Sequence, residues 1–218
     1  MDIVHPAVTR YLENLARHDD EPVLLEMEKL AAEKHFPIIG RLCGQYLEMI
    51  ARSIGAKRIF ELGSGYGYSA YWFARATGPE AEIHLTDTDP ENERLALDFL
   101  TRAGLDKPIR YHLSDALVAL DETQGDFDIL YCDIDKAGYP DAWERGKARV
   151  RVGGFYMCDN MLWFGRVTDE GSDVSEDPHQ EGATEAIKQT NEMIAADPNW
   201  RSIINPTRDG VVTALRIA

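Results

Sequence analysis

Residues 56–69 read AKRIFELGSGYGYS, an apolar run that leads into a glycine-rich turn and then into helical spacing. The run at 57–62 has the character of a buried strand, and the glycines allow the backbone to turn sharply. The spacing after the turn predicts a helix over 68–77. A strand followed by a glycine turn and a helix is typical of the first unit of a parallel α/β sheet.

The same alternation continues along the chain. Further strands are predicted at 82–87, 108–113, 127–132 and 152–158, and further helices at 90–103, 139–149 and 181–196. Alternating strands and helices indicate a doubly wound, mostly parallel sheet that is covered on both faces. Near the C-terminus, Trp200–Asn205 and Val211–Ile217 flank an Asp209-Gly210 turn, which predicts an antiparallel hairpin and a sheet of seven strands in all.

The first 55 residues carry apolar positions at helical spacing, which predicts two or three helices before the first strand. We therefore expect one α/β domain over 1–218, with N-terminal helices at 1–55 and a Rossmann-like core at 56–218. One biased segment, from Thr168 to Gly182, is rich in acidic residues and predicts a mobile loop.

Composition excludes several classes of function. Lys and Arg number 23 against 38 Asp and Glu, so a nucleic acid would meet net repulsion from a formal charge of -15. The three cysteines form no paired spacing, which suits a reducing cytoplasm. The beginning of the sequence has no leader-like pattern, and no apolar run approaches 18 residues. We expect a cytoplasmic protein with neither a nucleic-acid partner nor a membrane.

Ligands of open α/β sheets bind at the carboxyl ends of the strands. After the first strand, Gly63, Gly65 and Gly67 follow a G-x-G-x-G pattern rather than the dinucleotide pattern G-x-G-x-x-G, and Glu61 precedes them. This favours a cationic ligand over a pyrophosphate. The alternative is a tight strand-to-helix turn without a ligand.

The ends of the second and third strands offer contacts for a nucleoside. Asp87 lies 20 residues past Gly67, where a carboxylate can accept both ribose hydroxyls. Asp89 precedes a proline and is predicted to cap the next helix. Asp115 and Ala116 could reach an adenine ring, although an Asp at this position is equally an ordinary helix cap.

The ends of the fourth and fifth strands supply Asp133, Asp159 and Asn160. These hard oxygen ligands suit Mg²⁺, Mn²⁺ or Ca²⁺ better than Zn²⁺. Cys132 and Cys158 precede the two Asp residues, so strand alternation points them to the opposite side. The alternative is that these carboxylates cap helices and solvate loops.

Three segments together carry a family resemblance: 56–69, DIDKAGY at 133–139 and GGFYMCDNMLW at 153–163. The chain resembles the cation-dependent class I O-methyltransferases, the group of catechol and caffeoyl-CoA O-methyltransferases. The resemblance implies S-adenosylmethionine as cofactor, a divalent cation (Mg²⁺ first, then Mn²⁺ or Ca²⁺) on Asp133, Asp159 and Asn160, and Lys136 as the catalytic base. The cofactor contacts that it implies are Ile39 through its backbone, Glu61, Gly63, Ser64, Ser69, Asp87, Asp115, Ala116 and Asp135, with Gly65 in the same glycine turn.

Two features bear on the acceptor. Phe164 follows Trp163 where the plant caffeoyl-CoA enzymes carry an Asn, so recognition of their substrates does not transfer. Trp143 and Trp163 could form an aromatic wall for a planar substrate, or belong to the core. For Lys136, the alternative to a base is a surface ion pair with Asp135 or Asp141.

The expected function is transfer of a methyl group from S-adenosylmethionine to a hydroxyl of a small aromatic diol or phenolic acceptor, assisted by the cation, with Asp133 and Lys136 as catalytic residues. A nicotinamide-dependent oxidoreductase on a similar sheet and a non-catalytic binding protein are the alternatives. A homodimer is expected from the resemblance and from the apolar surface of the N-terminal helices and the antiparallel edge.

Overall fold

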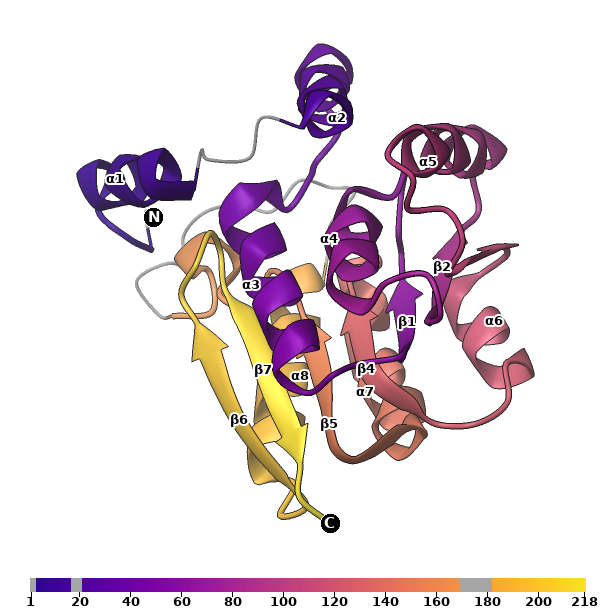
Figure 1. Ribbon diagram of the computed structural model, residues 1–218. Helices are drawn as coiled ribbons and strands as arrows, with labels where there is room; N and C mark the ends of the chain where they lie inside the picture. The colour runs from indigo at the N-terminus through magenta and orange to yellow at the C-terminus, as the bar shows by residue number, and fades with distance from the viewer. Residues whose placement is uncertain (1–2, 17–20, 169–181) are drawn as a thin grey trace.

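A seven-stranded sheet runs through the centre of the molecule in the order β3-β2-β1-β4-β5-β7-β6 (Figure 1). The computed structural model describes residues 3–16, 21–168 and 182–218. Strands β1 to β5 pair in parallel, whereas β7 is antiparallel to both β5 and β6. The strands are β1 (Arg58–Leu62), β2 (Glu82–Asp87), β3 (Ile109–Leu113), β4 (Phe127–Cys132), β5 (Val150–Cys158), β6 (Trp200–Asn205) and β7 (Val211–Arg216).

Helices cover both faces of this sheet (Figure 1). They are α1 (Pro6–Ala16), α2 (Pro22–Lys34), α3 (Gly40–Ser53), α4 (Tyr68–Thr77), α5 (Pro90–Arg102), α6 (Ala116–Glu122), α7 (Tyr139–Gly146) and α8 (Ala183–Ala196), with short 3-10 turns at Lys136–Gly138, Lys147–Arg149 and Trp163–Gly165. None of the helices in the described ranges is both long and apolar enough to cross a bilayer.

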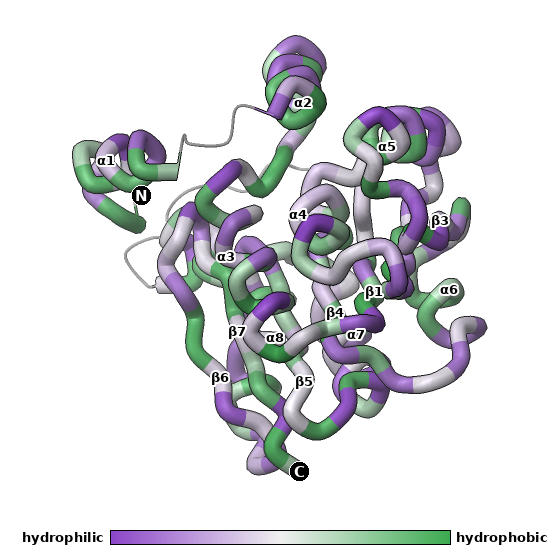
Figure 2. Tube along the Cα trace, viewed as in Figure 1, coloured by the Kyte–Doolittle hydropathy of each residue, from purple (hydrophilic) through white to green (hydrophobic). Residues whose placement is uncertain are grey.

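Strand alternation divides the interior into two cores. In β1, Ile59 packs with the helices α2 to α5, and its neighbour Phe60 packs with α6, α7 and α8. Packed beside α3 on one face of the sheet, helix α4 is apolar on nearly every side and fully buries Trp72 and Phe73. The peripheral helix α5, by contrast, is largely hydrophilic (Figure 2). The strands are thereby packed against helices on both faces, and the site lies at their carboxyl ends.

The predicted doubly wound sheet and its antiparallel hairpin are confirmed. Each predicted strand agrees with the structure to within two residues, the largest difference being that β5 begins at Val150 rather than 152. Helix α6 was not predicted, because its seven residues span only two turns and give little periodicity. The predicted helix over 139–149 ends as an α-helix at Gly146 and continues as a 3-10 turn. The predicted acidic loop lies, between its ends at Thr168 and Gly182, outside the described residues.

Candidate active site

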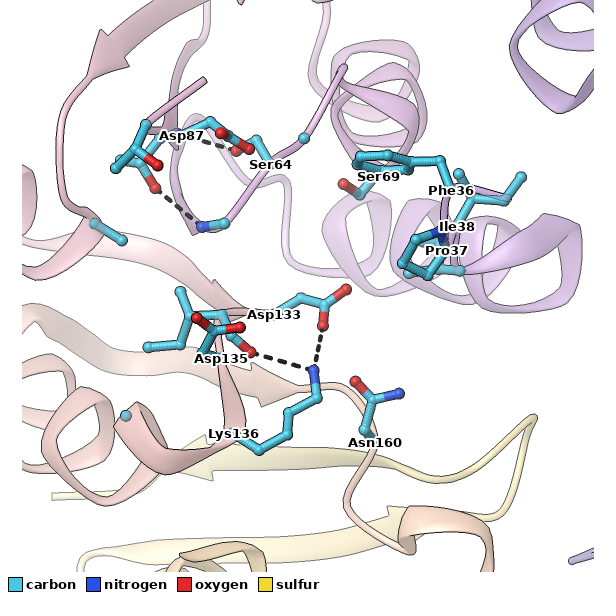
Figure 3. Close-up of a pocket in the computed structure, with 18 of the residues that line it drawn as sticks. Phe36, Pro37, Ile38, Ser64, Ser69, Asp87, Asp133, Asp135, Lys136 and Asn160 are labelled. Carbon is cyan, nitrogen blue, oxygen red and sulfur yellow. Dashed lines mark hydrogen bonds and ion pairs between the residues drawn. The ribbon is translucent and has the colours of Figure 1, made fainter. Parts of the chain in front are cut away.

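A cavity of about 1000 Å³ opens at the carboxyl ends of β1, β2, β3 and β4. Of the predicted site residues, only Glu61 and Asp159 do not line it, and Figure 3 shows several of the others around its rim. The predicted residues that line the cavity are Ile39, Gly63, Ser64, Gly65, Ser69, Asp87, Asp115, Ala116, Asp133, Asp135, Lys136 and Asn160. Sequence positions from 39 to 160 therefore meet in one place.

The glycine turn is held tightly between neighbouring strands. Gly63 has φ +80°, and a Cβ at this position would lie 2.4 Å from the backbone oxygen of Asp133. Ser64 is fixed from the other side, since its amide donates to Thr86 O at 2.8 Å and its hydroxyl accepts from Thr86 N at 3.1 Å. A glycine is thus required at 63 for the turn after β1 to approach the end of β4.

Glu61 lies just behind the cavity wall rather than in it. Ser69, which lines the cavity, donates a hydrogen bond to Glu61 Oε1, and Oε2 has no partner. Burial raises the pKa of Glu61 to about 8, against the lowering effect of the nearby hydroxyl groups of Ser69 and Ser64. A positively charged ligand in the cavity would stabilise this carboxyl group as an anion.

The carboxylate of Asp87 is oriented at the end of β2. It accepts from Asp89 N at 2.8 Å and from Asn92 Nδ2 at 3.2 Å. Asp89 caps α5 by accepting from Glu91 N, as predicted. Asp115 caps α6 and also lines the cavity, so the two interpretations of that residue are compatible.

Lys136 pairs with Asp133 inside the cavity. Its Nζ lies 2.9 Å from Asp133 Oδ1 and 3.2 Å from Ile134 O (Figure 3). Burial works to lower the pKa of Lys136, but the Asp133 carboxylate outweighs it and the pKa is raised. The alternative of a surface pair with Asp135 or Asp141 is therefore wrong: the partner is Asp133, and the lysine side chain is only 15% exposed.

Asp159 is fully buried and half satisfied. Its Oδ2 accepts from Arg208 Nη1 at 2.6 Å, and its Oδ1 has no hydrogen-bond partner. Burial and the neighbouring Asp133 raise the pKa of Asp159 to about 7, although Arg208 opposes the shift. One buried carboxylate oxygen is thus left in need of a donor or a cation.

Asn160 presents its amide oxygen toward the cavity. Its Nδ2 donates to both carboxylate oxygens of Asp209, at 3.0 and 2.9 Å, and this fixes which end of the amide is nitrogen because a carboxylate only accepts. The oxygen lies 3.4 Å from the Tyr139 hydroxyl and faces Asp133 and Lys136 in Figure 3. The predicted ligand set therefore offers three hard oxygens, which suit a divalent cation.

This set contains two carboxylates and one amide. Within the described ranges, no three His, Cys, Asp or Glu side chains gather into a metal cluster. Cys132 and Cys158 are buried in the core and do not line the cavity, as strand alternation predicted. Any metal site here would consist of oxygen ligands and lack sulfur and imidazole.

The aromatic wall is half right. Trp163 lines the cavity beside Phe164. Trp143 does not line it, because it is buried on the other side of β4 and packs edge-on against Tyr156 and Trp200, with ring centroids 5.0 Å away in both cases. The periodicity of α7 places Trp143 on the face of the helix that packs into the core.

Sequence reasoning missed Arg208, which pairs with Asp159, and Asp209, which accepts from Asn160. The three carboxylates that act on Arg208, those of Asp133, Asp159 and Asp209, form the acidic cluster of the site. Arg208 and Asp209 precede β7, and Cys158 at the end of β5 pairs with Val212 near the start of β7. The turn before an antiparallel neighbour lies at the carboxyl edge of the parallel strand, so the predicted hairpin contained the signal.

Known proteins show what this cavity belongs to. The family model described as O-methyltransferase matches residues 14–217. The chain belongs to the O-methyltransferase family. A protein of Arabidopsis thaliana named as a caffeoyl-CoA O-methyltransferase is 31% identical, over 97% of this chain and 94% of that protein. A catechol O-methyltransferase of Niastella koreensis is 28% identical, over 89% of this chain and 87% of the relative.

Solved structures share the fold of this O-methyltransferase. The O-methyltransferase from Bacillus cereus, solved in complex with SAH, superimposes with a TM-score of 0.82, at 24% identity, over 96% of this chain and 97% of that one. SAH is what remains of S-adenosylmethionine after it gives up its methyl group, so the ligand in that structure agrees with the expected cofactor. Membership also sets aside the alternative of a nicotinamide-dependent oxidoreductase.

Proposed function

We propose that this O-methyltransferase methylates a hydroxyl of a small catechol-like or phenolic acceptor, with a divalent cation, Mg²⁺ first, at Asp133, Asp159 and Asn160. The observation that carries the proposal is the unpartnered, fully buried Oδ1 of Asp159, next in sequence to Asn160, whose amide oxygen faces Asp133. The names of relatives, which include caffeoyl-CoA and catechol O-methyltransferases, support the acceptor class.

In this proposal, the donor occupies the cavity side between the glycine turn and α6. Asp87 accepts hydrogen bonds from the ribose hydroxyls, and Asp115 with Ala116 borders the adenine. Ser69 and the buried Glu61 behind it attract the positively charged part of the donor. The remaining contacts are Ile39, Gly63, Ser64, Gly65 and Asp135, all at the cavity wall.

Chemistry requires the acceptor hydroxyl to lose its proton, because an ordinary phenol has a pKa near 10 and is a poor nucleophile at neutral pH. The cation, when bound, supplies Lewis-acid stabilisation of the phenolate. Lys136 lies close enough to Asp133 to serve the same hydroxyl as proton acceptor. While it is paired with Asp133 the amine is protonated and cannot accept a proton. A cation on that carboxylate would weaken the pair and lower the pKa of Lys136, so that the amine could release its proton to solvent and then accept the proton of the acceptor hydroxyl.

In this proposal the acceptor ring lies beside Trp163 and Phe164, which both line the same cavity. A second cavity of about 710 Å³ shares Ile38, Ile39 and Arg208 with the first and extends toward α1 and α2. Its mixed apolar and polar lining suits the part of a small aromatic acceptor that extends beyond the ring bound in the first cavity.

Two substitutions test the division of labour. Asp159→Ala should abolish methylation of a catechol and leave donor binding, measured by calorimetry, nearly intact. Asp87→Ala should instead weaken donor binding roughly ten- to a hundredfold, the cost of a lost charged hydrogen bond, and should recover most of its methylation rate at saturating donor. Asp98→Ala, which removes an exposed carboxylate from α5, is the control for charge and should change neither.

Full activity after exhaustive EDTA treatment would sink the metal part of the proposal. Equal rates on mono-phenols and vicinal diols would remove the catechol part, because a cation that holds two substrate oxygens favours adjacent hydroxyls.

A further inference from the structure

We propose that Arg208 is a built-in cation of the acidic cluster: it covers Asp159, must swing away before a divalent ion can reach that carboxylate, and so weakens metal binding. This rests on the proposed metal site and deepens it, since it names the residue that sets the affinity.

The first support is the position of Arg208. Asp159 is fully buried and does not line the cavity, whereas Arg208 lines it and lies 2.6 Å from Asp159 Oδ2. The guanidinium therefore stands between the carboxylate and the cavity. An ion that enters from the cavity meets Arg208 before it meets Asp159.

The second support is the charge balance. Three carboxylates, Asp133, Asp159 and Asp209, act on Arg208, and Lys136 pairs with Asp133. Two cations thus face three anions, which leaves about one negative charge. A doubly charged ion added beside both cations would reverse that sign, and two positive groups a few ångströms apart in a buried site repel strongly. Removal of the arginine from Asp159 restores the balance.

The third support is a place for the arginine to go. Arg208 also lines the second cavity, together with Glu13 of α1, whose side chain is exposed. The arginine side chain is itself 31% exposed, so it is not locked in the core. A swing from Asp159 toward Glu13 would exchange one carboxylate partner for another.

The backbone at this position offers a clean test. Arg208 has φ +58°, a left-handed conformation that costs a residue with a Cβ some strain and suits glycine or asparagine. Arg208→Gly therefore deletes the cation without forcing the turn into a new shape. Arg208→Asn is the second variant, in case glycine loosens the loop.

The experiment is titration of Mn²⁺ into the protein without donor or acceptor, followed by calorimetry or by the loss of the free-ion electron paramagnetic resonance signal. Both Arg208 variants should bind Mn²⁺ roughly ten- to a hundredfold more tightly than the parent. In EDTA they should unfold at a lower temperature than the parent, because Asp159 loses its buried partner, and Mn²⁺ should restore the loss. Asp159→Ala combined with Arg208→Gly should remove the tight binding, which places the ion at this carboxylate.

Arg166→Gln is the matched control, since Arg166 lines the same cavity with its guanidinium over the rings of Trp163 and Phe164, whereas the arginine that pairs with Asp159 is Arg208. It should change the Mn²⁺ affinity far less. Unchanged or weaker Mn²⁺ binding in both Arg208 variants, with clear binding by the parent, would overturn the role of Arg208 and leave the metal proposal standing. Absence of Mn²⁺ binding by the parent and by both variants would overturn the metal site itself and the inference with it.

Discussion

At the scale of single residues, the proposed chemistry depends most directly on Lys136, the proposed base. Lys136→Met keeps an unbranched stem of four heavy atoms and removes the amine, so it should lower kcat roughly a hundred- to ten-thousandfold, the usual contribution of a general base. KM should change much less, because the contact matters mainly in the transition state. Steady-state kinetics on a catechol at saturating donor would measure both.

Lys147→Met serves as the matched control. Lys147 lies in the 3-10 turn after α7, pairs with Glu144 and does not line the cavity. A Lys136→Met enzyme with an unchanged kcat would mean that the lysine only neutralises Asp133. A rise in KM with constant kcat would instead assign it to acceptor binding.

One part of the site could be predicted from the sequence and another part could not. Asp133, Asp159 and Asn160 could be predicted to meet, because parallel strands place their carboxyl ends along one edge. The ion-pair partners of these carboxylates could not be predicted. Which cation each carboxylate finds depends on side-chain reach and on the antiparallel hairpin, and the pairing of Asp159 with Arg208 spans 49 positions.

At the scale of secondary-structure elements, β2 and β3 are joined by a pair of histidines, the buried His84 and the half-buried His112. His84 Nδ1 lies 2.8 Å from His112 Nε2, and the two rings stack with Phe60 alongside. Burial lowers the pKa of both histidines, and in His84 it outweighs the opposing effect of Glu82. The pair is therefore held neutral in the folded protein.

A histidine with a lowered pKa binds fewer protons when folded than when unfolded. Its contribution to stability is complete above the ordinary pKa near 6.5 and is lost as the pH falls below that value. Between pH 7.5 and 5.5, the melting temperature of the parent should therefore drop more than that of His84→Gln. Each kcal/mol corresponds to about 2–4 °C for a chain of this size.

The comparison must be made as a difference between proteins, because Glu61 and Asp159, with raised pKa values, shift stability in the opposite direction over the same range. The exposed His5→Gln should behave like the parent. Parallel pH curves for the parent and His84→Gln would show that the pair does not titrate with unfolding.

The elements themselves were largely predictable, for a physical reason. Central strands such as β1 and β4 are buried on both faces, so their sequences are short uninterrupted apolar runs between turn residues. The helix α6 was missed because only Ala119 and Leu120 of its seven residues are buried, and two buried positions do not establish a period. Tertiary packing decided this element.

At the scale of the whole molecule, α1 carries an apolar stripe that the described chain does not cover. Val8, Tyr11, Leu12 and Leu15 are spaced at i, i+3, i+4 and i+7 on one side of the helix, and they are 47%, 63%, 39% and 53% exposed. Four such side chains together on one helix are unusual for a monomer surface and mark an interaction site. We expect the stripe to pair with a second copy of the chain, in line with the homodimer proposed from the sequence.

The other apolar surface considered for a dimer is the edge strand β6, where Ile203 is 68% exposed. The neighbouring exposed positions on β6 are Arg201 and Ser202, and charged side chains on an edge strand oppose pairing between sheets. The stripe on α1 contains no charge at its four positions. It is therefore the better interface, and the two surfaces can be separated by mutation.

Light scattering after gel filtration at micromolar concentration should give the parent twice the 24.5 kDa mass of one chain. Tyr11→Lys combined with Leu15→Lys places two like charges one turn apart in the stripe and should shift the protein to the single-chain mass, because the two charges cannot pair with each other and would have to be buried in the interface. Ile203→Lys makes a comparable change on β6 and should leave the dimer intact. A parent that runs as one chain would refute the dimer, and a dimer broken only by Ile203→Lys would move the interface from α1 to the sheet edge.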